Sequence, residues 1–529
     1  MMTTTSDQPD RRRAQDSSSR AAVQHQDSGP SRRRVLGAAA LGGALAVPAA
    51  LGVAGAPGAL AAPGAPAAPS AAPLSRQDRV FLERGLRHGA WVMQEEMGWA
   101  PSPELFRDSG FTDPTWYDAP LWHGPLMEGL SDMPWSATKG PRGFHLDGSE
   151  EVPDQILTGT QKERADDLFT YCFGDEDNFS EALLAHLAEL FPVLRREAPD
   201  ALLHTNQYAF QWTDDQMKRF MQACRPDLLT FDSYYFSWTS QHASGSVTEA
   251  YNITARTREL ALLGNDLDGN SPLAFGQYSL GFRTGDMAWM EGYDYIVSQS
   301  QQYLAPYLTW TLGGKWNDLF RWQHGDHALL TRADGSPTTQ YERYRELNAR
   351  MHVLSPYLTR LQTHTASIVP GASDAGPNPD SRLPRFTSET DPGTGLLEVS
   401  AENIGGANDG LPGDVVIGTF RPIQGLSAEQ VGRFADPRTP AMMIMNGLVV
   451  PNVDPSIEDG VGGNAEDTRQ RLTLSFSLGE GRQTGKLMTV DQRTGKERRI
   501  PVTHRSHGVG KAQVEIDGGS AQLQWWDLR

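Results

Sequence analysis

Between Arg76 and about Leu361, short apolar or aromatic runs alternate with longer amphipathic stretches, and this alternation constrains the fold most strongly. The clearest unit is an apolar run at residues 167–173 followed by an amphipathic stretch at 180–196. Ser180 is a suitable N-cap there, and leucines recur behind it at helical spacing. Strands that alternate with helices form parallel sheets with crossover connections. A stretch of about 290 residues suits a (β/α)8 TIM barrel.

The other fold of this type is a doubly wound sheet, which usually has a Gly-rich nucleotide-binding turn after its first strand. Residues 94–99, Gln-Glu-Glu-Met-Gly-Trp, do not form such a turn, so the pattern favours the barrel. The expected strands are residues 88–94, 111–117, a weakly marked one between 130 and 143, 167–173, 201–207, 227–232, 273–277 and 307–310. The expected helices are residues 180–196, 214–224, 252–264, 291–303 and 339–361.

The composition and the residue pattern of the sequence change after residue 365. Residues 366–394 are rich in Pro, Gly, Ser and Asp and are expected to be a linker. Residues 395–529 then contain short runs of period-two alternation, each bounded by Gly, Asp or Pro, which is typical of an all-β sandwich. The expected domains are therefore a barrel at residues 74–365, the linker, and a β-sandwich domain at residues 395–529.

The first 73 residues have the composition of an export signal and a linker. Residues 1–30 are polar, three arginines follow at Arg32–Arg34, and an Ala/Gly-rich apolar stretch runs from Val35 to about Ala54. Residues 59–61, Ala-Leu-Ala, supply the small side chains that a signal peptidase requires, and residues 62–73 are rich in Ala, Pro and Gly. The segment resembles a twin-arginine signal, which implies a secreted protein without stable membrane insertion after cleavage. A single membrane anchor is the alternative.

Charge and cysteine content exclude several classes of function. Lys and Arg number 47 against 65 Asp and Glu, a net charge of −18, which disfavours binding to nucleic acid. Two cysteines, Cys172 and Cys224, are too few for a disulfide scaffold or a Cys-only metal site. Whether they pair stays open, and we expect neither a metal nor a cofactor.

In a (β/α)8 barrel the active site lies at the C-terminal ends of the strands. The side chains that follow the apolar runs are acidic, amide-bearing or aromatic, without a Ser–His pair. Carboxylates exchange protons at a glycosidic oxygen, and aromatic faces pack on sugar rings. The successive aromatics of residues 234–236 are notable because neighbouring strand residues face opposite ways. The expected sugar-binding residues are Gln94, Asn206, Gln207, Tyr208, Tyr234, Tyr235, Gln277 and Trp310.

Five short motifs between about residues 167 and 450 carry a family resemblance. They are Cys-Phe-Gly-Asp-Glu-Asp at 172–177, Arg-Pro-Asp-Leu-Leu-Thr-Phe-Asp-Ser-Tyr-Tyr at 225–235, Leu-Ala-Phe-Gly-Gln at 273–277, Asp-Gly-Ser-Pro-Thr-Thr-Gln-Tyr at 334–341, and Val-Gly-Arg-Phe-Ala-Asp at 431–436 with Ile-Met-Asn at 444–446. In order and spacing the chain resembles bacterial glycoside-hydrolase-like barrels related to β-galactosidase-type barrels, with an appended β-sandwich. Asp177 stands where that family usually has Pro.

The resemblance implies that Glu176 is the general acid, because the acidic residue after the fourth strand has that role in this clan. Retaining barrels carry a Glu nucleophile after the seventh strand, whereas this chain has Gln277 there. Three interpretations stay open. Asp232 acts as general base with inversion across a gap of about 6.5–9.5 Å, Asp175 orients an N-acetyl group of the substrate, or the barrel binds sugar without cleaving it.

We therefore expect an exported glycoside hydrolase that cleaves a poly- or oligosaccharide, with catalytic residues Glu176, Asp232 and Asp175. The alternative is a non-catalytic carbohydrate-binding barrel. The sequence specifies neither the sugar, the linkage nor the oligomeric state.

Overall fold

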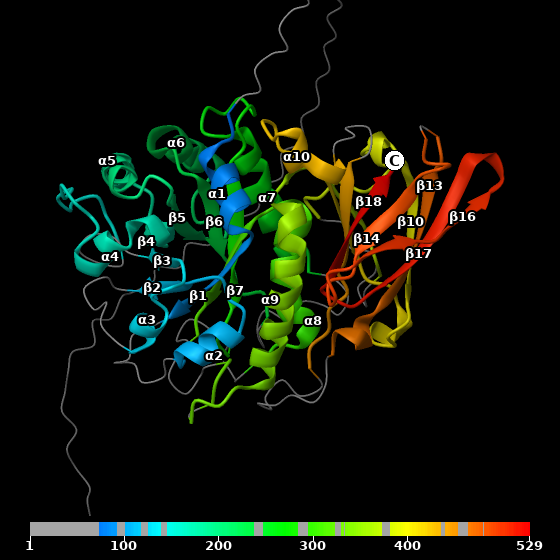
Figure 1. The fold of residues 1–529 in the computed structure, drawn as a ribbon, viewed down its shortest axis with the longest axis horizontal. Coiled ribbons are helices and arrows are strands. Elements are labelled where there is room, and N and C mark those ends of the chain that lie inside the picture. Colours follow the sequence, from blue (N-terminus) through cyan, green and yellow to red (C-terminus); the bar gives the residue numbers. More distant parts are fainter. Residues whose placement is uncertain are drawn as a thin grey trace, which may run out of the picture. The chain divides into compact units, whose positions relative to one another are not determined.

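The computed structural model falls into two units, Met1–Ala68 and Pro69–Arg529, and only the second is described below. Figure 1 shows its ribbon, with the barrel elements in blue to green and the C-terminal sheets in yellow to red. The described residues are 73–92, 101–117, 125–138, 145–236, 247–283, 295–322, 329–332, 334–372, 381–434, 440–452, 464–479 and 481–528.

Eight parallel strands close into a barrel in chain order, as the alternation predicted. They are β1 (Arg87–Val92), β2 (Pro114–Tyr117), β3 (Trp135–Thr138), β4 (Leu168–Asp175), β5 (Leu202–Tyr208), β6 (Leu228–Asp232), β7 (Ala274–Leu280) and β8 (Trp316–Phe320). β8 closes the barrel by pairing with β1, with Arg87 opposite Trp316. The (β/α)8 barrel fold is confirmed.

Among the helices described in this part of the chain, the first precedes β1 and the others follow the strands in turn. They are α1 (Arg76–Arg84), α2 (Pro103–Asp108), α3 (Pro125–Gly129), α4 (Gly159–Glu163), α5 (Glu181–Glu197), α6 (Asp214–Cys224), α7 (Thr248–Leu263), α8 (Gln299–Leu312) and α9 (Thr339–Leu358). α5 begins as predicted, because the Ser180 hydroxyl accepts a hydrogen bond from the Leu183 amide at 2.9 Å.

The predicted strand at residues 307–310 was wrong, because these residues belong to α8. A capping box of Ser298 and Gln301 starts this helix, and Gly313 ends it in the left-handed conformation at φ 95°. α8 is buried on nearly all sides, so the polar face that marks a surface helix is missing. A short apolar run inside such a helix resembles a buried strand. The eighth strand is β8, which the sequence pattern missed.

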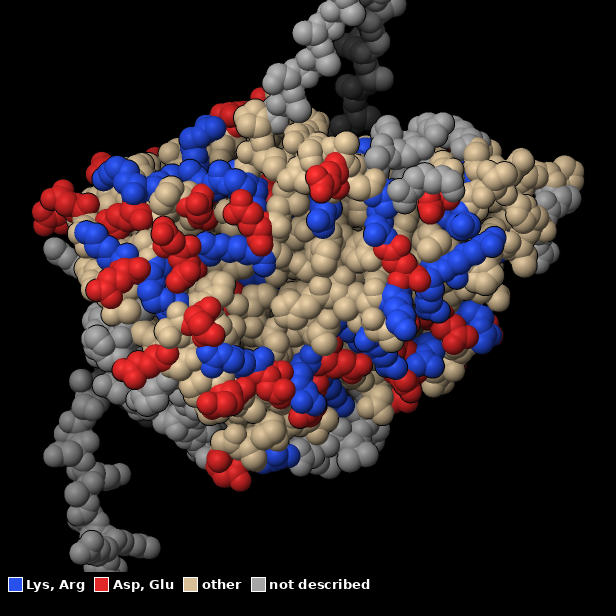
Figure 2. Space-filling model, viewed as in Figure 1, with Lys and Arg blue, Asp and Glu red and all other residues tan. Residues whose placement is uncertain are grey.

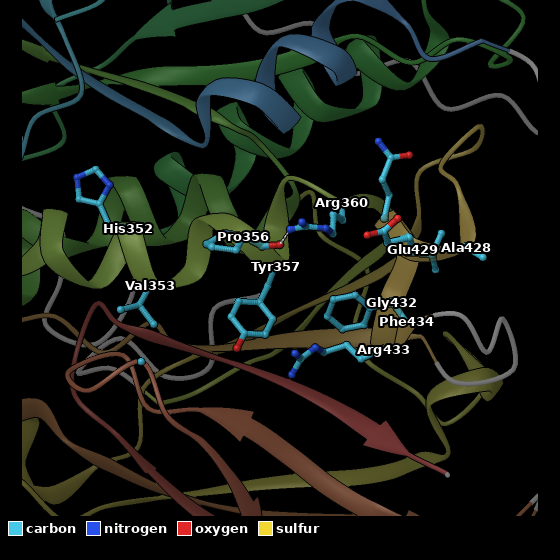
Figure 3. A pocket seen from close by; sticks show the side chains of 13 residues that line it. His352, Val353, Pro356, Tyr357, Arg360, Ala428, Glu429, Gly432, Arg433 and Phe434 are labelled. Atoms are coloured by element: carbon cyan, nitrogen blue, oxygen red, sulfur yellow. Dashed lines mark hydrogen bonds between the residues drawn. The ribbon is translucent and has the colours of Figure 1, made fainter. Parts of the chain in front are cut away.

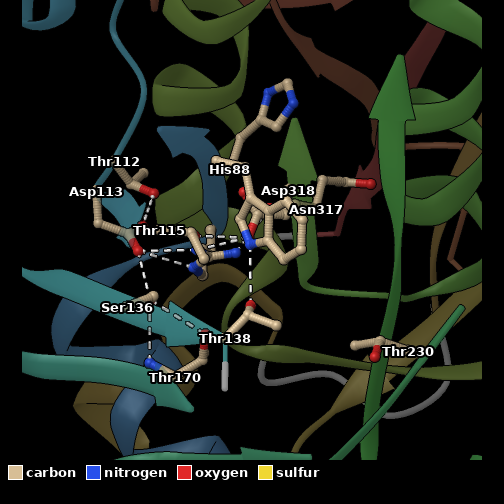
Figure 4. Close-up of polar contacts among 12 residues, drawn as sticks. His88, Thr112, Asp113, Thr115, Ser136, Thr138, Thr170, Thr230, Asn317 and Asp318 are labelled. Atoms are coloured by element: carbon tan, nitrogen blue, oxygen red, sulfur yellow. Dashed lines mark hydrogen bonds and ion pairs between the residues drawn. The ribbon is translucent and has the colours of Figure 1, made fainter. Parts of the chain in front are cut away.

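The barrel interior is closed below its C-terminal mouth by packed side chains. Phe81, Phe169, Leu202 and Leu228 form part of this plug. Next to this plug lies a buried ionic network centred on Arg87, whose guanidinium is 6.0 Å from the Phe169 ring centroid. Figure 4 labels its acidic members, Asp113 and Asp318.

Arg87 binds two buried carboxylates. Its Nε donates to Asp113 at 3.0 Å, and its Nη2 donates to Asp318 at 3.1 Å. Thr115 also donates to Asp318, at 2.7 Å, and Ser136 donates to Asp113 at 2.5 Å. Because buried charges are costly unless paired, these bonds fix the barrel strands against one another.

The C-terminal part is a β-sandwich of two antiparallel sheets, as predicted. One sheet has the order β10-β13-β17-β16 and the other β15-β14-β18-β12-β11-β9. The strands are β9 (Leu361–Val369), β10 (Leu396–Asn403), β11 (Val415–Pro422), β12 (Ala441–Asn446), β13 (Gln470–Ser477), β14 (Lys486–Val490), β15 (Glu497–Ile500), β16 (Val502–Arg505), β17 (Val509–Ile516) and β18 (Ala521–Asp527).

The six-stranded sheet packs against the barrel helices. Residues of β11, β12 and β18 share one hydrophobic core with α8 and α9. Hydrogen bonds add to this contact: Ser298 donates to the Val450 carbonyl at 2.6 Å, and Asn452 donates to the Ile296 carbonyl at 2.8 Å.

Lys and Arg are interspersed with Asp and Glu on the face shown in Figure 2. Both cysteines are free and buried. Within the described residues, no helix is long and apolar enough to cross a membrane.

Candidate active site

Glu176 follows β4 directly and has an unusual backbone conformation. Its φ is 52°, which costs a non-Gly residue about 1–2 kcal/mol. The conformation is held from both sides, since its amide donates to the Asn206 carbonyl at 3.0 Å and its carbonyl accepts from Gln211 at 2.7 Å. Gly174, two residues earlier, has φ 70°, and a Cβ there would lie 2.0 Å from the Asp177 carboxylate. This local backbone geometry sets the direction in which the Asp175 and Glu176 side chains leave the end of β4.

Asn206 on β5 joins the acids that end β4 and β6. Its Nδ2 donates to Asp175 at 2.8 Å and to Asp232 at 3.1 Å. The register of the parallel strands explains this, because Asp175 is paired with Asn206 in one ladder and Asp232 with Tyr208 in the next. Glu176 also forms a side-chain hydrogen bond with Asp232. Three carboxyl groups predicted from the sequence therefore lie together.

Burial governs the protonation of this cluster. Desolvation raises the pKa of Asp175 to about 7, against a smaller lowering by the Asn206 hydrogen bond. The pKa of Asp232 is raised well above its ordinary value, first by burial and then by the nearby charges of Glu176 and Asp175. Because like charges in a desolvated site cannot all ionise, the cluster retains protons near neutral pH.

The separation expected for an inverting pair is absent between Glu176 and Asp232. A direct hydrogen bond between two carboxyl groups leaves no room for a water molecule, whereas inversion needs about 6.5–9.5 Å.

A cavity of about 630 Å³ opens at this end of the barrel. Its described lining residues are Trp91, His145, Asp175, Glu176, Asn206, Tyr208, Ala209, Asp232, Ser233, Tyr234, Glu249, Tyr278 and Phe320. Such a volume suits a small ligand.

One wall of this cavity is aromatic. The rings of Trp91 and Phe320 lie 4.8 Å apart between centroids, and Tyr234 lies 6.0 Å from Phe320. Trp91 is fixed by donating from Nε1 to Thr138 at 2.9 Å, a bond shown in Figure 4. Tyr208 is half exposed at the rim. These rings offer faces on which a sugar can pack.

Two titratable groups in the cavity were not singled out from the sequence. Glu249 lies in the first turn of α7, where the helix dipole favours an anion. His145 places its Nδ1 3.2 Å from Asp177. The sequence pattern points only to residues that directly follow an apolar run. Glu249 and His145 do not, so the sequence does not indicate them.

Several expected sugar-binding residues lie outside the cavity lining. Gln277 on β7 is fully buried and points toward the helices, where its Nε2 donates to Thr309 at 2.8 Å and to the Ala305 carbonyl at 3.0 Å. Its Oε1 accepts from the Tyr235 hydroxyl at 2.8 Å. Alternation along β7 explains this, because the next residue, Tyr278, faces the cavity.

Some of the remaining predicted residues are buried outside the cavity, and others line it. Gln207 is buried and donates to Thr205 at 3.2 Å, and Trp310 is buried in α8. Asn206, Tyr208 and Tyr234 do line the cavity. Gln94 lies outside the described residues.

A second cavity, of about 830 Å³, lies beside the last turns of α9 and is shown in Figure 3. Tyr357 and Arg360 line it from α9, and Arg433 lines it from beside α10 (Ala428–Val431). It is remote from the strand ends, because α9 leads back to the opposite end of the barrel.

Within the described part of the chain, no group of three or more His, Cys, Asp or Glu side chains is arranged to hold a metal ion.

No protein-family model and no curated protein matches the chain. Similar solved structures include a β-galactosidase from the psychrophilic Marinomonas ef1, at 12% identity over 51% of this chain and 60% of that one, with a TM-score of 0.35. A family 5 mannosidase from Rhizomucor miehei matches at 11% identity over 52% and 95%, with a TM-score of 0.34. A cycloisomaltooligosaccharide glucanotransferase from Paenibacillus sp. matches at 9% identity over 84% and 85%, with a TM-score of 0.43.

Proposed function

We propose that this protein is an exported glycoside hydrolase that cleaves a poly- or oligosaccharide with Glu176 as general acid. The observation that carries the proposal is the hydrogen-bonded pair of Glu176 and Asp232 inside an aromatic-walled cavity at the C-terminal end of the barrel. A general acid needs a proton near neutral pH, and the neighbouring Asp232, whose pKa is raised by burial and by the nearby charges of Glu176 and Asp175, is a source of one. The arginines and apolar stretch of residues 32–54 support export.

The roles of the neighbouring groups follow from their contacts. Glu176 donates its proton to the glycosidic oxygen, and Asp232, whose pKa is raised, keeps a proton available to the pair. Asn206 holds Asp232 and Asp175 in place through its amide. Asp175 contributes a further carboxyl next to the bond that is cleaved.

A second acid is needed on the other side of the sugar, because the Glu176–Asp232 pair has no space for water. Glu249 lines the same cavity from α7, an element separate from β4 and β6. We assign to Glu249 the activation of the water molecule that attacks the sugar. The aromatic wall of Trp91, Tyr234 and Phe320 positions the sugar ring.

The test is Glu176→Gln, assayed against a panel of polysaccharides and aryl glycosides. We expect hydrolysis of a substrate with a poor leaving group to fall about 10²-fold or more, because the amide has no proton to donate at this strength. Sugar binding should remain, since the amide keeps the shape of the side chain. Wild-type turnover in this variant would remove the assignment of Glu176.

A non-catalytic carbohydrate-binding barrel is the second candidate. It is favoured by one observation: the carboxyl groups of Glu176 and Asp232 touch, rather than standing apart on either side of a substrate. Binding by the folded wild-type protein without any product, across the whole panel, would establish this function instead.

A further inference from the structure

Four carboxyl side chains from three elements line the cavity. Asp175 and Glu176 come from the end of β4, Asp232 from β6 and Glu249 from α7. Among the described lining residues, His145 alone has a side chain able to carry a positive charge, and it already contacts Asp177 outside the cavity. A ligand that enters this cavity meets four carboxyl groups, and the pKa values of two of them, Asp175 and Asp232, are raised by burial so that they hold protons near neutral pH.

The aromatic wall also attracts cations, and one of its rings, Phe320, already has the Arg321 guanidinium 5.3 Å from its centroid. Trp91, Tyr234, Tyr278 and Phe320 line the cavity together with the acids. The face of an aromatic ring is electronegative and attracts a cation, and the attraction grows when the cation is removed from water.

An unpartnered polar group also points to a ligand. Tyr278 is 2% exposed and lines the cavity, yet its hydroxyl has no hydrogen-bond partner among the described residues. The same holds for the Asn206 Oδ1 atom. Buried polar groups are normally hydrogen-bonded, so these two atoms are available to a bound molecule.

We propose that the cavity recognises an amino sugar, a sugar unit that carries a free ammonium group. This inference rests on the proposed function and specifies its class of substrate. Acids, ring faces and unpaired oxygen atoms all complement an ammonium group that carries several hydrogen-bond donors. An ammonium group would favour the ionised form of Asp175 and Asp232, whereas the carboxylate of a uronic acid would oppose it, and an N-acetylated or neutral sugar would bring no charge to these two groups.

Asp175 is the residue best placed to set this preference. Its carboxyl is oriented by the Asn206 amide at 2.8 Å, and it is one residue away from the proposed acid Glu176. An ammonium group bound there would ion-pair with the Asp175 carboxyl, which accepts a hydrogen bond from the Asn206 amide and lies near the acids Glu176 and Asp177. Asp175→Asn removes the charge and keeps the shape and the hydrogen bond from Asn206.

The experiment measures binding by calorimetry with three matched tetrasaccharides: one of glucosamine, its fully N-acetylated counterpart and one of glucose. The protein is tested as wild type and as Glu176→Gln, which separates binding from cleavage. We expect the glucosamine compound to bind at least about tenfold more tightly than the other two. Asp175→Asn should abolish that preference, and Tyr278→Phe should weaken binding of the glucosamine compound.

Asp215→Asn is the charge-matched control, because Asp215 is an exposed residue of α6 paired with Lys218. It should keep the preference. Equal or tighter binding of the N-acetylated or neutral compound by the wild type would overturn the inference.

Product analysis on the wild type separates the two proposals. Binding of the glucosamine compound with no cleavage of any substrate in the panel would leave the inference standing and remove hydrolysis. Cleavage of a neutral glycan, with no binding of the glucosamine compound, would support hydrolysis and overturn the amino-sugar inference.

Discussion

Neighbouring residues at the end of β6 have opposite environments. Tyr234 lines the cavity and packs edge-on against Phe282, with 4.9 Å between centroids. Tyr235 is buried on the other side and donates its hydroxyl to Gln277. Alternation along an extended chain separates two chemically identical side chains, one toward a ligand and one toward the helices.

Tyr234→Ala and Tyr235→Ala form a matched pair of variants. Loss of Tyr234 should raise the KM for a cleaved sugar more than it lowers kcat, because ring stacking is mostly uniform binding. Loss of Tyr235 should leave KM unchanged and lower the free energy of unfolding by about 3–5 kcal/mol, through the cavity that it leaves. Steady-state kinetics and denaturant unfolding measure the two effects. The same kinetic change in both variants would contradict this division.

The role of Glu249 is a second prediction at the residue scale. Glu249→Ala should slow hydrolysis by about 10²-fold, and formate or azide should restore part of the rate by filling the vacated space. Asp232→Ala should also be slow but should respond weakly to these anions, because Asp232 supports the proton on Glu176. If formate or azide rescued Asp232→Ala and not Glu249→Ala, the role assigned to Glu249 would belong to Asp232.

At the scale of elements, β7 illustrates how one strand serves two purposes. Its inward residues Ala274 and Tyr278 contribute to the barrel interior, and Tyr278 reaches the cavity. Its outward residue Gln277 connects the barrel wall to α7 and α8 through Thr254, Thr309 and the Ala305 carbonyl. The amide therefore belongs to the packing of helices on the barrel.

Gln277→Ala should accordingly affect stability and not catalysis. The change removes the hydrogen bonds that join Gln277 to the Tyr235 and Thr309 hydroxyls and to the Ala305 carbonyl in a buried site, at a cost of about 0.5–1.5 kcal/mol for each lost bond. Denaturant unfolding should show the loss, while kcat and KM stay at wild-type values. A selective change in kinetic constants with unaltered stability would place Gln277 in the site after all.

At the scale of the whole second unit, the barrel and the six-stranded sheet share a hydrophobic core. Met443 and Met445 of β12 and Leu523 of β18 pack in the same cluster as Leu304 and Leu308 of α8. The four-stranded sheet meets the six-stranded one across a separate core that includes Leu474, Phe476 and Trp526. The sandwich is thus built onto the outer helices and away from the cavity.

The buried acids make stability depend on pH. The pKa of Asp175 is raised by desolvation to about 7, and that of Asp318 also to about 7 despite its bond to Arg87. A carboxyl whose folded pKa lies above its unfolded pKa stabilises the fold fully only below about pH 4, and this contribution is lost as the pH rises through about 7.

Asp175→Asn should therefore be more stable than the wild type near pH 8, and the difference should shrink toward about pH 4. Denaturant unfolding at several pH values measures it, with Asp215→Asn on exposed α6 as a control whose difference from wild type stays flat. A stability difference for Asp175→Asn that grows as the pH falls would show that Asp175 is not held in its raised-pKa state.

The sequence by itself determined the alternation that builds the barrel, the period-two runs of the sandwich and the acids that follow β4 and β6. These features are local, because capping, periodicity and strand ends are properties of neighbouring residues. Tertiary structure decided which face each strand end presents, as with Gln277 and Tyr278, and whether a buried apolar run such as α8 is helix or strand. It also brought Glu249 into the cavity and set Glu176 against Asp232, because those contacts join elements that are distant in the chain.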